Sequence, residues 1–271
     1  MVRRRLKYIC RNNIVIRDMT ESEAIALLVS TTSNGYKKID DLPIFKIFLP
    51  SFLKSIEKDD KDKDKYKYII YVGYDNGDIL YDIRKHEIKM KIKTMIEGYP
   101  NVKLKYVNYE NNIKSPCLIW NNLYKLAYTK GCNYFYQLGD DILFITSGWT
   151  EVFIEALKKS PVGEDIGVVG PLDINLKRKV AIILTQAFVS RRHYEIFGYL
   201  YPEVFKNWFS DDWITEVYQK YYSNLCKAIT VKNSGGKERY AIDNGAGNIL
   251  KEAVRLGEEK IDKYLFNLNH S

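Results

Sequence analysis

Apolar runs of strand length alternate with segments of helical spacing along roughly the first 170 residues, and this alternation constrains the fold more than any other feature. Residues 24–31 are a largely apolar run followed by turn residues, which is typical of a strand buried on both faces of a parallel sheet. Further strands are predicted at 68–74, 102–107, 133–138 and 166–169. Helices are predicted between them, at 42–56, 82–97, 115–129 and 150–159. The pattern predicts an α/β fold with a mostly parallel sheet flanked by helices.

The last 100 residues are less regular. They hold a β-like run, an aromatic segment, a Gly-rich basic stretch and a final helix, at 180–190, 194–222, 231–247 and 249–268. No linker separates them from the alternating part, so we expect one domain over residues 1–271. His193 follows two arginines and is expected on the surface at the start of a helix.

Composition excludes several classes of protein. The 271 residues are 46% hydrophobic, which excludes a disordered chain. No apolar run approaches the roughly 20 residues of a membrane-spanning helix, and the first residues lack the apolar core of a signal peptide. The four cysteines form no CxxC pair, which favours reduced thiols. We therefore expect a cytoplasmic protein without a transmembrane segment.

The formal charge is +8, from 42 Lys and Arg against 34 Asp and Glu. A basic surface favours anionic partners such as phosphates, nucleotide-sugars or nucleic acid. Many lysines nevertheless alternate with acidic residues, as in residues 57–65, which indicates diffuse solvation rather than one binding stripe. Nucleic acid is therefore not an expected partner.

Two adjacent carboxylates follow the predicted strand 133–138, in the sequence Gly139-Asp140-Asp141. Ligands of open parallel sheets bind where strands end, so this position favours a binding role. Two like charges held together need a cation or a shared proton, and a hard divalent cation with oxygen ligands fits. The alternative is a simple turn or a helix cap.

A second acidic pair, Asp211-Asp212, lies among two Trp, one Phe and one Ile. Such aromatic side chains could form a wall for a sugar ring, and a carboxylate beside it could act as a general base on a hydroxyl. Alternatively, Asp211 caps a helix and the tryptophans belong to the core.

The stretch 231–240 combines a Gly-Gly pair with three cations, so it could close on a pyrophosphate. Lys232 and Lys237 are the candidate contacts to that group. A mobile surface loop is the alternative. Asp243, a few residues on, is a candidate third metal ligand that no motif supports.

Taken in order, these motifs resemble those of nucleotide-sugar-dependent glycosyltransferases of the GT-A fold, of the inverting, family-2-like type. The resemblance covers roughly residues 24–218. Members carry a helix with an Asn, then a strand and an Asp-X-Asp motif. Here Asn121 lies on the predicted helix and Asp141 matches the second Asp, whereas Gly139 departs from the first.

The resemblance implies a GT-A (Rossmann-like) sheet in which about residues 20–170 bind the nucleotide-sugar and about 171–271 bind the acceptor. The implied metal is Mn²⁺ or Mg²⁺, on Asp140 and Asp141, with Asp243 added as the candidate third ligand. The implied donor-binding residues are Thr31, Thr32, Asp75, Asn121 and Asp140, to which the basic stretch adds Lys232 and Lys237. The implied catalytic base is Asp212, with Asp211 as second choice.

The expected reaction moves a sugar from a nucleoside-diphosphate sugar, most simply a UDP-sugar, to a hydroxyl of a glycan, protein or lipid. Two alternatives stay open. A sugar-phosphate nucleotidyltransferase would carry a Gly-rich loop with an Arg after the first strand, which residues 31–36 lack. A non-catalytic nucleic-acid-binding protein would need a basic stripe interleaved with aromatics. The sequence does not determine the oligomeric state, for which a homodimer is one possibility.

Overall fold

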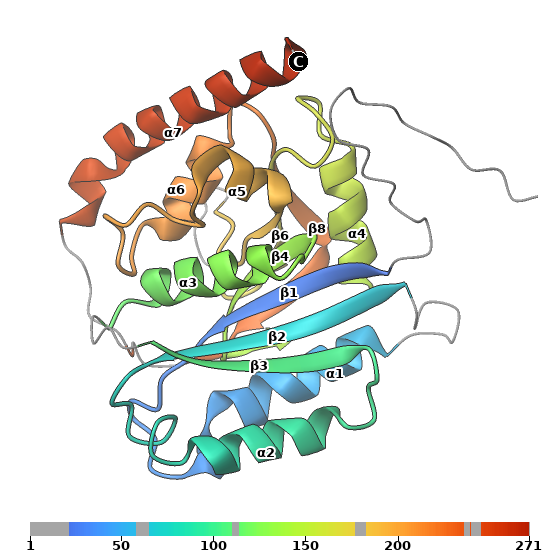
Figure 1. Cartoon of the computed structure of the whole chain (residues 1–271), viewed down its shortest axis with the longest axis vertical. Coiled ribbons are helices and arrows are strands. Elements are labelled where there is room, and N and C mark those ends of the chain that lie inside the picture. The colour runs from blue at the N-terminus through green and yellow to red at the C-terminus, as the bar shows by residue number, and fades with distance from the viewer. Residues whose placement is uncertain are drawn as a thin grey trace, which may run out of the picture.

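The computed structural model contains one mixed sheet with the strand order β3-β2-β1-β4-β7-β6-β8-β5. Figure 1 shows β3, β2 and β1 side by side. The structure describes residues 22–57, 65–109, 114–176, 183–235, 239 and 245–270. The strands are β1 (Glu23–Ser30), β2 (Tyr66–Asp75), β3 (Val102–Tyr109), β4 (Tyr134–Gly139), β5 (Ile142–Phe144), β6 (Val168–Asp173), β7 (Phe188–Ser190) and β8 (Ser223–Asn233). This confirms the predicted α/β fold with a mostly parallel sheet flanked by helices.

Strands β1 to β4 form the parallel half of the sheet. Strand β1 lies between β2 and β4, and Ser30 at its end is in register with Gly73 and with Gly139. From Ile25 onward β1 is completely buried, as expected for a strand covered on both faces. The residues that follow these three strands therefore meet at one edge of the sheet.

The other half of the sheet contains reversed strands. Strand β7 is antiparallel to β4, and β8 runs parallel to β6 and antiparallel to β5. Only two residues separate β4 from β5, so their facing ends lie within about 11 Å of each other, three Cα steps of 3.8 Å. The sheet must therefore curl until β5 and the end of β8 approach the end of β4.

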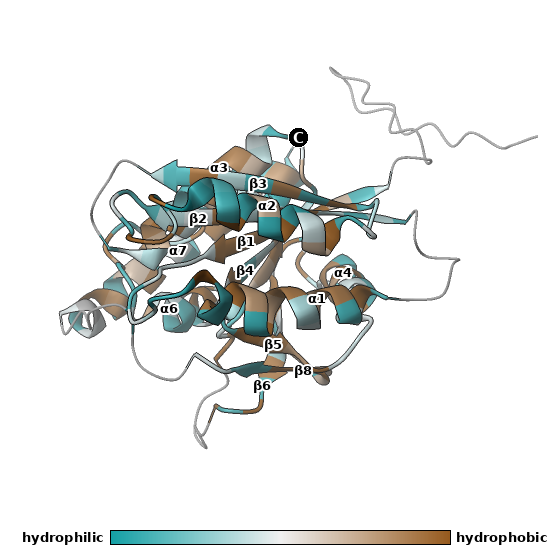
Figure 2. Cartoon of the chain, turned by 90° about the horizontal axis from the view of Figure 1, so that it is seen from below, coloured by the Kyte–Doolittle hydropathy of each residue, from teal (hydrophilic) through white to brown (hydrophobic). Residues whose placement is uncertain are grey.

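Helices cover both faces of the sheet (Figure 1). They are η1 (Ile39–Asp41), η2 (Ile44–Phe48), α1 (Leu49–Ile56), α2 (Lys85–Ile96), α3 (Pro116–Thr129), α4 (Trp149–Lys158), α5 (Arg191–Phe197), α6 (Ser210–Val217) and α7 (Ala246–Asn269). One apolar core joins the sheet to α1, α2 and α4, and a second joins it to α3, α5, α6 and α7. Figure 2 shows polar and apolar stretches alternating along α1 and α2, whose apolar sides face the sheet.

Several predicted elements differ from the structure. The helix predicted at 42–56 is three pieces, because η1 and a π-helical turn, η2, precede α1. The β-like run predicted at 180–190 reduces to β7 within the described residues. Strands β5 and β8 have no counterpart in the prediction. None of the helices in the described ranges has both the length and the apolarity that a membrane crossing requires.

Candidate functional site

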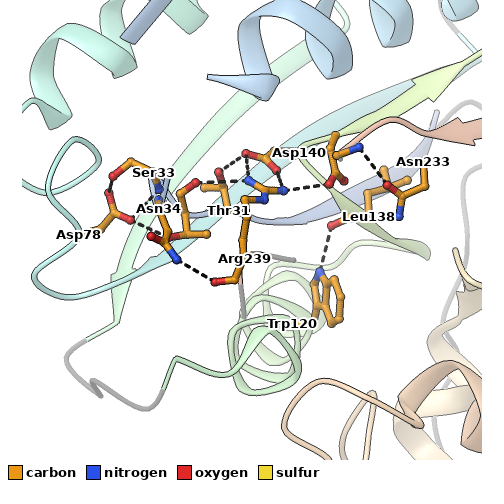
Figure 3. Close-up of polar contacts among 12 residues, drawn as sticks. Thr31, Ser33, Asn34, Asp78, Trp120, Leu138, Asp140, Asn233 and Arg239 are labelled. Carbon is orange, nitrogen blue, oxygen red and sulfur yellow. Dashed lines mark hydrogen bonds and ion pairs between the residues drawn. The ribbon is translucent and has the colours of Figure 1, made fainter. Parts of the chain in front are cut away.

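The acidic pair Asp140-Asp141 lies between β4 and β5, at the edge where β1, β2 and β4 end. The side chain of Asp140 is completely buried. The hydroxyl of Thr31, the residue after β1, donates a hydrogen bond to it, with 2.5 Å between Oγ1 and Oδ2 (Figure 3). A buried carboxylate is costly unless it is paired and hydrogen-bonded, so this position demands a cation.

Arg239 supplies that cation. Its guanidinium nitrogens donate to Oδ1 and Oδ2 of Asp140, at 2.5 and 3.2 Å, and to Oδ2 of Asp141 at 3.0 Å. A further bond of 3.3 Å goes to the carbonyl oxygen of Thr32, and Asn34 donates from its amide to the carbonyl of Arg239 (Figure 3). The guanidinium is 12% exposed. The planar fork of arginine suits this bidentate geometry.

Two glycines make room for the carboxylate of Asp141. A Cβ on Gly139 would lie 2.5 Å from its Oδ1, and a Cβ on Gly235 would lie 1.9 Å from its Oδ2. The chain after β8 is also fixed there, because Ser234 donates its backbone N–H to the carbonyl of Asp141 at 2.9 Å. A side chain at Gly139, the departure from the Asp-X-Asp pattern, would therefore displace the carboxylate of Asp141 from its position.

The surroundings of Asp141 disfavour the charged form of its carboxylate. Burial raises its pKa, the neighbouring charge of Asp140 raises it further, and the Arg239 guanidinium opposes both effects. The pair is thus stabilised chiefly by a cation close to both carboxylates.

The loop after β1 is fixed by Asp78, which sequence analysis did not single out. Its carboxylate accepts hydrogen bonds from the hydroxyls of Thr32 and Ser33, at 2.9 and 2.5 Å, and from the backbone N–H of Ser33 at 2.8 Å. It also accepts from the backbone N–H groups of Leu80 and Tyr81. Asp78 therefore joins the loops after β1 and β2 into one unit. An Asp that precedes a turn is the sequence signal that could have indicated it.

Asp75 ends β2 at the same sheet edge and is half-buried. Burial, and secondarily the charge of Asp78, raise its pKa to about 6. Within the described residues its carboxylate has no recorded hydrogen bond. A carboxylate in this condition is suited to accept a hydrogen bond from a ligand.

The other residues that were predicted to bind the nucleotide-sugar donor have surroundings different from those of Asp75. Asn121 on α3 uses its whole amide on the chain before α6: Nδ2 donates to the carbonyl of Tyr201, and Oδ1 accepts from the backbone N–H groups of Leu200 and Tyr201. Lys232 lies half-buried on β8, in register with Leu143 of β5. Lys237 and Asp243 fall outside the described residues.

The second acidic pair begins α6. Burial, and secondarily the charge of Asp212, raise the pKa of Asp211 to about 6. Phe209, the residue before α6, has a positive φ of 66°, a strained conformation for a bulky side chain. The two tryptophans lie in different environments. Trp213 is completely buried and its indole N–H donates to the carbonyl of Ala253, whereas Trp208 is 38% exposed. Trp213 thus belongs to the core, whereas the ring of Trp208 is partly open to solvent.

Segment 206–211 docks on the start of α3. The carbonyl of Lys206 accepts from the Ser115 hydroxyl at 2.7 Å and from the Cys117 backbone N–H at 3.2 Å. The Asp211 charge contributes to a raised pKa of the Cys117 thiol, after burial, so the two side chains are near neighbours. Helix α3 follows β3, whose carboxyl end lies at the edge that holds Asp140. The second acidic pair is therefore on the side of the molecule where the first one lies.

The described residues contain no group of three or more His, Cys, Asp or Glu side chains that could hold a metal. Asp140 and Asp141 do present hard oxygen donors, which suit Mg²⁺ or Mn²⁺. Three of their four carboxylate oxygens accept hydrogen bonds from Arg239. The donor chemistry fits a divalent cation once the guanidinium has moved away.

Several solved structures are similar to the chain at low identity. One is a 4-diphosphocytidyl-2C-methyl-D-erythritol synthase of Anaerococcus prevotii, at 13% identity and a TM-score of 0.41, covering 89% of this chain and 99% of that chain. Another, assigned as a nucleotide-diphospho-sugar transferase of Desulfovibrio desulfuricans, has 10% identity and a TM-score of 0.45, with 87% and 98% covered. A UDP-glucose pyrophosphorylase in complex with UDP-glucose has 10% identity and a TM-score of 0.40, with 88% and 99% covered.

No family model matches the chain, and no curated protein sequence matches it.

Proposed function

We propose that the chain transfers a sugar from a nucleoside-diphosphate sugar, in the favoured case a UDP-sugar, to an acceptor hydroxyl. The observation that carries the proposal is the convergence of Thr31, Asp75 and the pair Asp140-Asp141 at the carboxyl edge of β1, β2 and β4. Open α/β sheets bind ligands at this edge.

In this proposal the nucleoside lies against the loop of Thr31 and Thr32, and Asp75 accepts a hydrogen bond from the base or the ribose. We assign Lys232, on β8, to contact with the diphosphate. Lys237 is assigned to the same group from the sequence alone. Asn121 contributes by holding the chain at Leu200 and Tyr201 in place.

Asp140 and Asp141 would hold Mn²⁺ or Mg²⁺, with Asp243 as the third ligand suggested by the sequence. When bound, such an ion neutralises charge on the departing nucleoside diphosphate. Asp212, or Asp211 as second choice, removes the proton of the acceptor hydroxyl, which attacks the anomeric carbon from the face opposite the leaving group and inverts its configuration. The exposed ring of Trp208 is suited to stack on the acceptor sugar.

Thermal unfolding with UDP, UDP-sugars and other nucleoside diphosphates, each with and without Mn²⁺, tests the proposal. A ligand at 100 times its dissociation constant adds about 2.7 kcal/mol to the free energy of unfolding. Asp141→Ala should remove the Mn²⁺-dependent part of this gain, while the exposed control Asp262→Ala should keep it. Stabilisation by no nucleotide, with the wild-type chain folded, would contradict the proposal.

A sugar-phosphate nucleotidyltransferase is the second candidate, and one observation favours it. The loop after β1 lacks its own Arg, but Arg239 lies hydrogen-bonded to the carbonyl of Thr32 in that loop. The two reactions differ in their products. Incubation with a nucleoside triphosphate and a sugar 1-phosphate would release pyrophosphate in this case, whereas a glycosyltransferase would release nucleoside diphosphate from a nucleotide-sugar.

A further inference from the structure

The cation between the two carboxylates of the candidate site is part of the chain. Arg239 contacts both Asp140 and Asp141, at guanidinium–carboxylate distances of 2.5 to 3.2 Å. Asp140 is completely buried, and the side chains of Arg239 and Asp141 are 12% and 14% exposed. Exposed ion pairs contribute little to stability, but a buried and bidentate pair is strongly held.

The surroundings fix the guanidinium in this position. The Thr32 carbonyl accepts one of its hydrogen bonds, and the Asn34 amide holds the backbone of Arg239. The absence of side chains at Gly139 and Gly235 leaves room for the carboxylate of Asp141. The geometry thus matches a guanidinium between two carboxylates, built from three segments of the chain: the loop after β1, the turn between β4 and β5, and the chain after β8.

A divalent cation would need the same oxygens. Three of the four carboxylate oxygens of the pair accept from Arg239, and Oδ2 of Asp140 also accepts from Thr31. A guanidinium and a metal ion within reach of the same carboxylates would also repel each other in a site with little water.

We propose that Arg239 is the resident counter-ion of Asp140 and Asp141 and competes with a divalent cation for them. Metal enters only when the guanidinium leaves, so the ligand-free protein binds metal weakly. This inference rests on the proposed function only in taking the acidic pair as the metal site. Arg239 is in this sense a positioning residue, because it sets the metal affinity of the pair.

Binding of Mn²⁺ alone, followed by the electron paramagnetic resonance signal of the free ion, tests the competition on the full chain without nucleotide. Arg239→Gln should bind Mn²⁺ more tightly than wild type by roughly tenfold or more, the ratio that corresponds to about 1.4 kcal/mol. Arg239→Lys keeps a charge but loses the fork, and should lie between the two. Arg255→Gln, on the exposed face of α7, should bind Mn²⁺ as wild type does.

Adding Asp141→Asn to Arg239→Gln should abolish the gain, because the tighter binding requires both carboxylates. Arg239→Gln leaves a buried carboxylate without its partner and is the variant most at risk of unfolding, so thermal unfolding is recorded for every variant. If it does not fold, Arg239→Lys carries the test. Equal Mn²⁺ affinity in wild type and in the folded variants would overturn the proposal. Because no nucleotide is present, this result does not depend on whether the chain binds a nucleotide-sugar.

Discussion

Thr31 and Asp140, 109 residues apart in the sequence, are joined by a buried hydrogen bond of 2.5 Å between Oγ1 and Oδ2. Each residue directly follows a strand, β1 and β4 respectively, and the two strands are neighbours in parallel register. This bond ties the nucleotide loop predicted from the sequence to the predicted metal pair.

Replacing Thr31 by Val removes the donor and leaves Asp140 with one partner fewer in a dry site. A hydrogen bond to a charged group contributes about 1.5–3 kcal/mol, so the free energy of unfolding in urea should fall by about that amount. Thr31→Ser keeps the hydroxyl and should recover most of the loss. Equal stability of the Val variant and wild type would show that the bond contributes nothing.

Gly235→Ala places a methyl group where the structure has the Asp141 carboxylate, 1.9 Å from the ideal Cβ. Either the carboxylate or the backbone after β8 must move, at a cost of about 1–3 kcal/mol in unfolding free energy. Nucleotide stabilisation should weaken with it. Gly98→Ala is the matched control, because no atom lies within 4 Å of its Cβ position. A Gly235 variant that matches this control in both assays would contradict the packing argument.

Asp75 makes stability depend on pH. Its pKa is raised to about 6 in the folded protein, above the value of about 3.9 in an unfolded chain. The folded state therefore favours the protonated acid, and this contribution is present below pH 4 and lost as pH rises through 6. Asp75→Asn cannot ionise, so its stability relative to wild type should rise by about 2 kcal/mol between pH 4 and pH 7. Urea unfolding at the two pH values measures this change, and a pH-independent difference would contradict it.

We expect Asp212 to act in catalysis and Asp211 to act in structure. Asp212→Asn keeps the shape but removes the base, so transfer should slow by roughly 100-fold or more while donor affinity stays near wild type. Asp211→Asn keeps an acceptor for the backbone N–H of Asp212, so it should change stability little if Asp211 only organises the start of α6, where Asn and Asp serve equally well.

Product formation at saturating donor, together with calorimetric donor titration, separates these effects. Because the pKa of Asp211 is raised to about 6, a larger loss of rate in Asp211→Asn would transfer the role of base to that residue. Full activity in both variants would remove the pair from the mechanism.

The sequence predicted the parts of the site that follow buried strands. A run of apolar residues precedes each of Thr31, Asp75 and Asp140. The carboxyl ends of parallel strands meet at one edge of the sheet, so strand prediction alone places these residues together. Arg239 is one of the three cations of the stretch 231–240, but its pairing was not predicted, because its partners Asp140 and Thr32 are 99 and 207 residues away. Strand β8 was missed for a similar reason, since its burial alternates irregularly around a break in its register with β6.

His193 shows how a local pattern misleads. The two preceding arginines suggested a surface position, and this prediction was wrong. The imidazole is buried, Nδ1 lies 3.0 Å from the Tyr218 hydroxyl, and Nε2 lies 3.1 Å from the carbonyl of Leu200. Burial lowers its pKa to about 3, so the ring is neutral and serves the core. The burial of His193 follows from the tertiary packing of α5 against the chain around Tyr218, which the local sequence does not indicate.

The distance in sequence between Asp140 and Arg239 sets an order of events while the chain is being made. A ribosome adding about 5–20 residues per second needs roughly 5–20 seconds to reach Arg239 after completing Asp140. During that interval β1 and β4 can already pair, but the carboxylate between β4 and β5 has no guanidinium to balance it. Burying such a charge alone is unfavourable, so this edge of the nascent sheet should stay hydrated until the last part of the chain arrives.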